Sequence, residues 1–160
     1  MYRTQQDFIN DWAHASKGTL KVLQAVTDEK LNQAIADEHN TLGWLGWHLT
    51  TSAALFAGLS GLQVTSPGND KEVPSHAADI AGAYEKAAEE ITKSAEASLT
   101  DEMMAESINA FGKPMPRGAF LRVLIDHQTH HRGQMTVLLR QAGLPVPGVM
   151  GPTKEEGMSF

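Results

Sequence analysis

The chain has 160 residues, of which 41% are hydrophobic and 20% are charged, and its formal net charge is -6. This length and composition are typical of a globular protein with a single core, so we expect residues 1–160 to form one domain. The negative charge argues against nucleic-acid binding, which usually relies on a basic face. The absence of cysteine excludes disulfides, cysteine-ligated zinc and a cysteine nucleophile.

The sequence contains no segment that predicts contact with a membrane. The first residues lack the apolar core of a signal peptide. No run approaches the roughly 18 apolar residues that a membrane span requires. We therefore expect a cytoplasmic protein with neither a membrane nor a nucleic acid as partner.

Four segments carry apolar residues at steps of three and four, which is the signature of amphipathic helices. We expect helices near residues 4–25, 41–60, 75–96 and 116–142. The inward positions of the first two helices are Ile9, Trp12, Ser16, Leu20 and Leu23, then Leu45, His48, Ser52, Leu55 and Leu59. Those of the last two are Ile80, Ala83, Tyr84, Ala87 and Ile91, then Phe120, Leu124, His127, His131, Met135 and Leu138.

The segments between these helices supply start and stop signals. Asn40 or Thr41 can cap the second helix, and Ser75 is the predicted N-cap of the third. The stretch 98–116 is irregular, with room for an extended segment near 107–111. The Gly- and Pro-rich tail, 144–160, is expected to lie over the helices. Four helices with one apolar stripe each predict an all-α fold, a four-helix bundle.

Three histidines fall on inward positions. His127 and His131 are four residues apart and therefore share one helix face, and His48 lies in the middle of the second stripe. A lone core histidine is usually hydrogen-bonded and nothing more. Three buried imidazoles would need several polar partners, whereas one shared cation satisfies all of them. The spacing therefore favours a divalent metal held by His48, His127 and His131.

Other polar and aromatic residues near this run have simpler interpretations. His130 lies about 100° around the helix from His131, and we expect it to pair with Asp126 at the flank of the bundle. Arg132 and Gln134 either line a site or form hydrogen bonds between helices, and spacing does not decide between these roles. The three tryptophans are expected in the core or in the wall of a cavity: Trp12, Trp44 and Trp47.

Two motifs give the chain a family resemblance. The segment Leu-Gly-Trp-His-Leu at 45–49 and the run Asp-His-Gln-Thr-His-His-Arg-Gly-Gln at 126–134 resemble the DinB/YfiT-like family of metalloenzymes. The approach Met-Pro-Arg-Gly at 115–118 and the exit Leu-Leu-Arg-Gln-Ala-Gly at 138–143 are also similar. The order of elements matches over nearly the whole chain, although a single upstream histidine is not specific by itself.

The resemblance implies an up-down-down-up bundle, commonly a homodimer, with a metal on His48, His127 and His131. Zinc or nickel is the implied metal. Characterised relatives include transferases and isomerases that use low-molecular-weight thiols such as bacillithiol or mycothiol. This implies that a small-molecule substrate reacts with an exogenous thiol.

Three functions remain open from the residues alone. Three neutral ligands leave a metal with its full charge and an open position, which suits a thiol-dependent transferase or a metal-dependent hydrolase. A non-enzymatic, stress-related metal-binding bundle is the third. The all-histidine set argues against an iron oxygenase with two histidines and a carboxylate. For the transferase, we expect a hydrophobic electrophile in a cavity lined partly by Trp12, Trp44 and Trp47.

Overall fold

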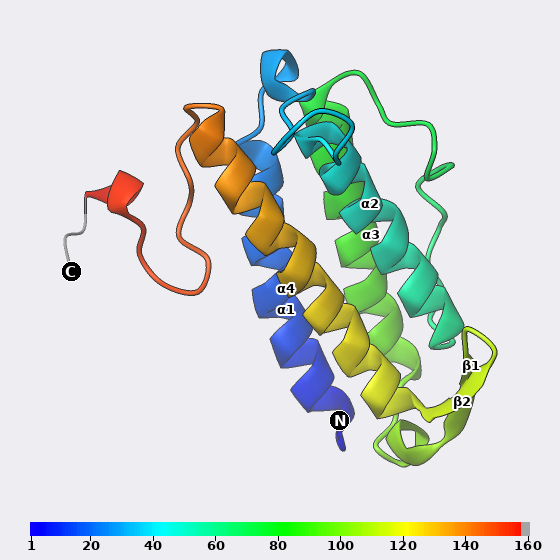
Figure 1. The fold of residues 1–160 in the computed structure, drawn as a ribbon. Coiled ribbons are helices and arrows are strands. Elements are labelled where there is room, and N and C mark those ends of the chain that lie inside the picture. The colour runs from blue at the N-terminus through cyan, green and yellow to red at the C-terminus, as the bar shows by residue number, and fades with distance from the viewer. Residues whose placement is uncertain (158–160) are drawn as a thin grey trace.

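The fold is that of a computed structural model of the chain, in which residues 1–157 are described (Figure 1). Within these residues four long helices account for most of the fold: α1 (Gln5–Gln24), α2 (Leu42–Leu59), α3 (Ala77–Ser98) and α4 (Arg117–Gln141). All four predicted helices are present, and their bounds differ from the predicted ones by at most two residues. No helix among the described residues is long and apolar enough to cross a membrane.

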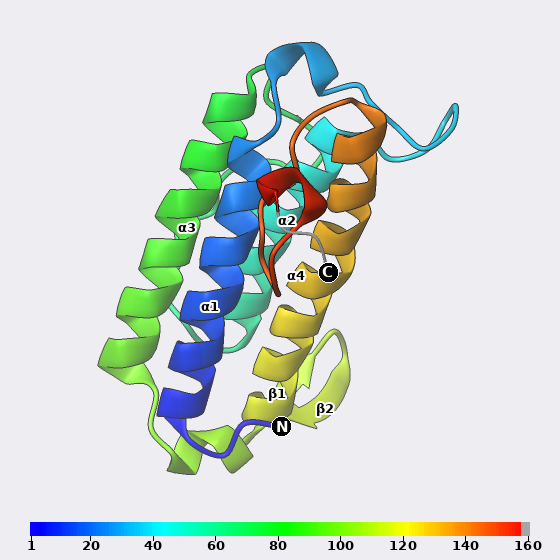
Figure 2. The ribbon, with the colours of Figure 1, turned by 90° about the vertical axis from the view of Figure 1, so that its left-hand side faces the viewer.

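The helices form a four-helix bundle in which each helix packs on two others. α1 and α4 run in one direction, and α2 and α3 run in the opposite direction (Figures 1 and 2). α1 packs against α3 and α4, and α2 packs against the same two helices. The predicted all-α, up-down-down-up bundle is thereby confirmed. Because α2 and α3 are parallel neighbours, residues 60–76 must travel back along the bundle, and they run alongside α2 (Figure 1).

Two helices are capped at their N-termini by a residue next to them in the sequence, and α3 is capped by a residue from a distant segment. The hydroxyls of Thr4 and Thr41 each accept a hydrogen bond from the backbone N–H three residues later, at 3.1 Å. The predicted cap Ser75 does not cap α3. Instead, Asp28 from the α1–α2 connection accepts from the Ala77 N–H at 2.7 Å. Asp28 also pairs with the His76 ring at 2.9 Å, which lowers the pKa of Asp28 and raises that of His76.

The first helix turns a slightly different face inward than predicted. Trp12 and Leu23 are buried as expected, but Phe8, Ala15 and Thr19 are buried in place of Ile9, Ser16 and Leu20. The C-terminal tail packs closely against the same helix. A Cβ at Gly18 would lie 2.5 Å from Cγ1 of Val149, so the tail approaches α1 where no side chain stands between them.

Residues 144–157 of the tail lie over α1 and α4 (Figure 2), and the last three residues of the predicted tail, 158–160, lie outside the described residues. Lys21 of α1 donates to the carbonyl of Gly148 at 3.4 Å, and Arg140 of α4 pairs with Glu155 at 2.7 Å. Val146 is buried in the core. These contacts cover the α1–α4 side of the bundle, which is the side away from residues 60–76.

A short hairpin replaces part of the irregular stretch before α4. Strands β1 (Ser107–Ala110) and β2 (Lys113–Pro116) pair antiparallel. Phe111 at its tip has a positive φ of 52°, which is uncommon for a residue with a bulky side chain. Its ring is 60% exposed and packs on Phe56 and Phe120, with centroid distances of 5.4 and 5.6 Å. The hairpin thus carries an aromatic ring to the α2–α4 seam.

Two polar residues on the core face of α4 connect it to the other three helices. Gln128 is fully buried, accepts from the Tyr84 hydroxyl at 2.9 Å and donates to the Leu49 carbonyl at 3.1 Å. One turn later, the buried Arg132 donates to the Ala15 carbonyl at 2.9 Å and to the Thr19 hydroxyl at 3.2 Å. Buried hydrogen bonds therefore join α4 to α1, α2 and α3.

Gln128→Leu should lower the free energy of unfolding by about 1–3 kcal/mol, because the buried Tyr84 hydroxyl loses its acceptor. Chemical denaturation followed by circular dichroism measures this change. Tyr84→Phe is the matched control. The double variant should lose less stability than the sum of the two single variants, because both remove the same bond. Strict additivity would contradict the assigned interaction.

Candidate metal centre

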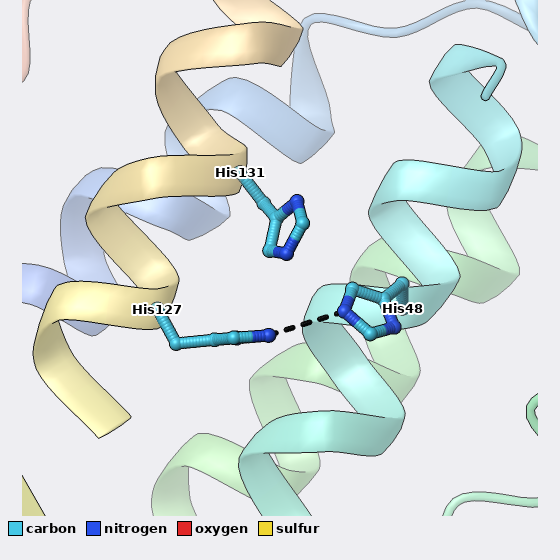
Figure 3. A group of neighbouring side chains, drawn as sticks. All are labelled: His48, His127 and His131. Atoms are coloured by element: carbon cyan, nitrogen blue, oxygen red, sulfur yellow. Dashed lines mark hydrogen bonds between the residues drawn. The ribbon is translucent and has the colours of Figure 1, made fainter. Parts of the chain in front are cut away.

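Three imidazoles meet between α2 and α4 (Figure 3). His48 comes from α2, whereas His127 and His131 come from successive turns of α4. One nitrogen from each ring lies within 4.8 Å of the others, and the Nε2 atoms of His48 and His127 are 3.2 Å apart. The ring of His131 lies edge-on to both neighbours at 4.5–4.6 Å between centroids. The structure thus brings together the three histidines that the sequence singled out.

The spacing of these nitrogens fits a shared first-row metal. Zinc–nitrogen bonds are about 2.0–2.1 Å, so two nitrogens on a tetrahedral ion lie about 3.3 Å apart. The His48–His127 separation of 3.2 Å already matches this value. Each ring is half-buried and projects from a helix whose backbone is fixed by the core. The group could therefore hold a metal without any change in the bundle.

Burial keeps all three imidazoles in the neutral form that binds metals. Desolvation, followed by the charges that neighbouring rings would carry, lowers the pKa of His127 to about 4. Burial also lowers the pKa of His48, with His131 adding to the shift and Asp70 opposing it. Burial also lowers the pKa of His131, and the hydrogen bond that its ring donates to Gln134 opposes this shift. Each neutral ring thus has a nitrogen lone pair that can bind a metal ion at neutral pH.

Partners on the far side of two rings select the nitrogen that faces the centre. The Nδ1–H of His131 donates to Oε1 of Gln134 at 3.1 Å, which leaves the Nε2 lone pair free. Nδ1 of His127 lies 3.5 Å from the Ser52 hydroxyl, which can accept from it in the same way. The amide nitrogen of Gln134 lies 3.1 Å from Nε2 of His130. Gln134 therefore links the exposed His130 to the centre without bringing His130 into it.

Aromatic rings enclose the centre on two sides. Trp44, one turn before His48 on α2, stacks on its ring at 4.8 Å and an interplanar angle of 9°. Phe56 lies 5.1 Å from the His127 ring, and it is itself covered by Phe111 of the hairpin tip. These contacts limit how the rings of His48 and His127 can rotate, and they give the centre apolar walls.

Two predictions about flanking residues are decided by the contacts. The expected Asp126–His130 pair is wrong: Asp126 instead accepts from Nε and Nη2 of Arg122, at 2.9 and 2.7 Å. A guanidinium one turn away offers both a charge and two donors, which a neutral imidazole cannot match. Arg132 forms hydrogen bonds between helices, whereas Gln134 contacts the site. Spacing left two roles open for both residues, and the structure gives the interhelix hydrogen bonds to Arg132 and the contact with the site to Gln134.

The predicted role in a cavity beside the metal is wrong for Trp12 and Trp47, whereas Trp44 does lie at the centre. Trp12 is buried between α1 and α3 and donates to the Ala88 carbonyl at 3.2 Å. Trp47 donates to the Asn69 carbonyl at 2.7 Å and so holds the 60–76 segment. A cavity does lie beside His48, but its described lining comes from α2 and residues 64–70 and includes no tryptophan. Of the three, Trp44 alone touches the triad.

Some residues of the site lie in helical patterns of the sequence, but periodicity alone does not tell them apart from ordinary core residues. Gln128 and Arg132 lie on a second stripe of α4 with steps of four and three, formed by Leu121, Ile125, Gln128, Arg132, Met135 and Leu139. Ser52 was placed on the inward stripe of α2 without a role. The sequence around Phe111 does not indicate a place at the site, because the fold of the hairpin brings this residue there.

Comparisons with known proteins support the likeness over nearly the full chain. The sequence profile of the DinB family matches residues 1–158. An uncharacterized protein of Bacillus subtilis strain 168, YrdA, is 41% identical over 160 residues, covering 100% of this chain and 96% of that protein. The crystal structure of a DinB-like protein from Bacillus cereus ATCC 10987 is similar with a TM-score of 0.89 and 42% identity, over 93% of this chain and 99% of that one.

A second solved structure, a DinB-like protein (YjoA) from Bacillus subtilis, shares the fold at lower identity. Its TM-score is 0.67 and its identity is 19%, over 86% of this chain and 92% of that one. The bundle arrangement is therefore common to chains whose sequences have diverged widely.

Replacing any one of His48, His127 and His131 by Ala should abolish stoichiometric binding of zinc, because two imidazoles rarely retain a divalent ion. Elemental analysis of the purified variants, with calorimetric titration, measures the loss. His130→Ala is the matched control and should bind one ion, since His130 packs against His131 and Gln134 but is not one of the three converging rings. Loss of metal in His130→Ala with retention in His131→Ala would reverse the assigned helix face.

Gln134→Leu should weaken zinc binding about 10- to 100-fold, the usual effect of removing a hydrogen-bond partner from a ligating histidine. Gln134→Glu keeps an acceptor for the Nδ1–H of His131 and should bind zinc at least as tightly as the unmodified chain. Competition titration with a chromophoric chelator gives both affinities. Equal losses in the two variants would mean that the hydrogen bond does not position His131.

Proposed function

The chain belongs to the DinB family, and on that premise we propose that it is a metal-dependent transferase that activates a low-molecular-weight thiol. In this proposal His48, His127 and His131 hold one divalent ion, zinc or nickel. The observation that carries it is the convergence of three half-buried imidazoles from facing helices, with two of them oriented by Gln134 and Ser52.

The donor set determines what chemistry the ion supplies. A dication held by three neutral ligands keeps its full charge and favours the deprotonated form of a thiol that reaches it. The thiol must come from outside, because the chain has no cysteine. In the transfer, the sulfur forms a bond to an electrophilic carbon, the leaving group departs with its electron pair, and the thiol proton passes to solvent.

The residues around the triad serve this reaction by orientation and by excluding water. Trp44 and Phe56 limit the rotation of His48 and His127 and present apolar surface to the reactants. Gln134 holds the proton of His131 on Nδ1 and thereby directs Nε2 to the centre. The homodimer implied by the family stays a prediction, and sedimentation analysis at working concentration tests it.

Spectroscopy of the cobalt-substituted protein tests the proposal. Addition of a small thiol, such as cysteine methyl ester, should produce an intense sulfur-to-cobalt charge-transfer band, and His48→Ala should not give it. His130→Ala should keep the band and serves as the control. If a series of thiols gives no band while the metal-loaded protein hydrolyses esters or amides, the protein is a hydrolase instead. A metal-loaded protein with neither property would be a binding protein without catalysis.

A further inference from the structure

A cavity of about 550 Å³ opens beside the triad, between the outer face of α2 and residues 64–70. This volume is within the range of small-molecule sites. The cavity shares His48 and Ser52 with the candidate metal centre, because both residues line it and both contact His127. A molecule in the cavity would therefore lie directly against the His48 ring, one residue away from His127 through Ser52.

The outer wall of the cavity is held in place at several points. At its start, the Gln63 and Thr65 N–H groups donate to Ser94 and Glu90 of α3, at 2.8 and 2.6 Å. Further on, the Asn69 carbonyl accepts from the Trp47 indole at 2.7 Å. Gly68 has a positive φ of 144° and sits where a Cβ would lie 3.1 Å from the Trp47 ring. The wall is therefore a fixed part of the fold.

The lining changes character from one end to the other. Residues 64–70 run antiparallel to α2, so Val64 lies toward the end of α2 and Asn69 lies near Trp47. The end of the cavity near the C-terminus of α2 is apolar, with Leu55, Leu59 and Val64, and Leu55 is 52% exposed. The end near His48 carries hydroxyl and amide groups. Among the described lining residues Asp70 alone is charged, so an anionic group finds no lysine or arginine there.

Gly58 leaves the apolar end open. It lines the cavity, and a Cβ built on it meets no atom within 4 Å. It lies ten residues after His48, which is about 15 Å along the helix axis. A side chain at this position would enter the cavity without displacing any other part of the protein.

We propose that this cavity binds the organic substrate, and that the substrate is an amphipathic molecule without negative charge whose apolar chain extends from the triad toward Gly58. The assignment rests on the proposed function for the role of the triad. It corrects the wall expected from the sequence, since Leu55, Leu59 and Val64 take the place of the tryptophans. Gly58 then determines the length of chain that fits.

Titration of the zinc-loaded protein with 1-hexanol, followed by amide NMR shifts, tests the proposal. The largest shifts should occur at Gly58, Val64 and Gly68. Gly58→Leu should raise the Kd for 1-hexanol at least tenfold, because the new side chain occupies the apolar end. Hexyl sulfate should bind the unmodified chain at least tenfold more weakly than 1-hexanol does.

Gly82→Leu is the matched control, since Gly82 lies within α3, outside the cavity lining, and a Cβ there also meets no atom within 4 Å. Both variants replace a helical glycine by a better helix former, so both should fold, as circular dichroism will verify. Gly82→Leu should leave the Kd unchanged, whereas Leu55→Ser should raise it severalfold. Equal affinity in Gly58→Leu and the unmodified chain, or shifts centred elsewhere, would overturn the assignment.

Zinc titration of the same samples separates this proposal from the proposed function. Gly58→Leu should bind zinc like the unmodified chain, because Gly58 touches no ligand. If the unmodified chain binds 1-hexanol in the cavity but takes up no zinc, the proposed function fails while the cavity assignment holds. If it binds zinc and thiol but not 1-hexanol, the cavity assignment alone fails.

Discussion

The buried side chain of Gln128 fixes the level at which α2 and α4 meet. It donates to the carbonyl of Leu49, the residue after His48, and it is itself the residue after His127. Its other end accepts from Tyr84 of α3. A slip of α4 along α2 would leave these groups unpaired in the core, which is costly. The hydrogen bond between Gln128 and Leu49 therefore maintains the distance between the His48 and His127 rings, although neither ring takes part in it.

The run from His127 to Arg132 consequently has two functions on adjacent faces of one helix. His127 and His131 face the opening between α2 and α4, while Gln128 and Arg132, each one residue later, face the core. A helix turns by about 100° per residue, so two such pairs cannot exchange places without rotating the helix. A rotation in either direction that moved the imidazoles would also carry Gln128 and Arg132 away from their partners in the core. The core bonds thus protect the orientation of the centre.

Much of the fold and the triad follows from periodicity. The four stripes predicted the helices closely, and His127 with His131 shared a face because a four-residue step leaves no alternative. The errors came where a distant segment decides the local outcome. Asp28 caps α3 in place of Ser75, and Arg132 of α4 bonds to the buried Ala15 and Thr19 of α1. Leu55 and Leu59 matched an inward pattern, yet they face a cavity formed by a segment whose path periodicity cannot give.

The parallel direction of α2 and α3 has a consequence for how such a protein can change. A connection between parallel neighbours has to cover the whole length of the bundle, and here it does so as a chain without helix or strand from 60 to 76. Substitutions or length changes in that segment would reshape the space next to His48 while the helices and their polar bonds stayed as they are. The architecture separates the part that holds the imidazoles from the part that chooses what reaches them. One scaffold can therefore acquire new specificities by altering a single surface connection.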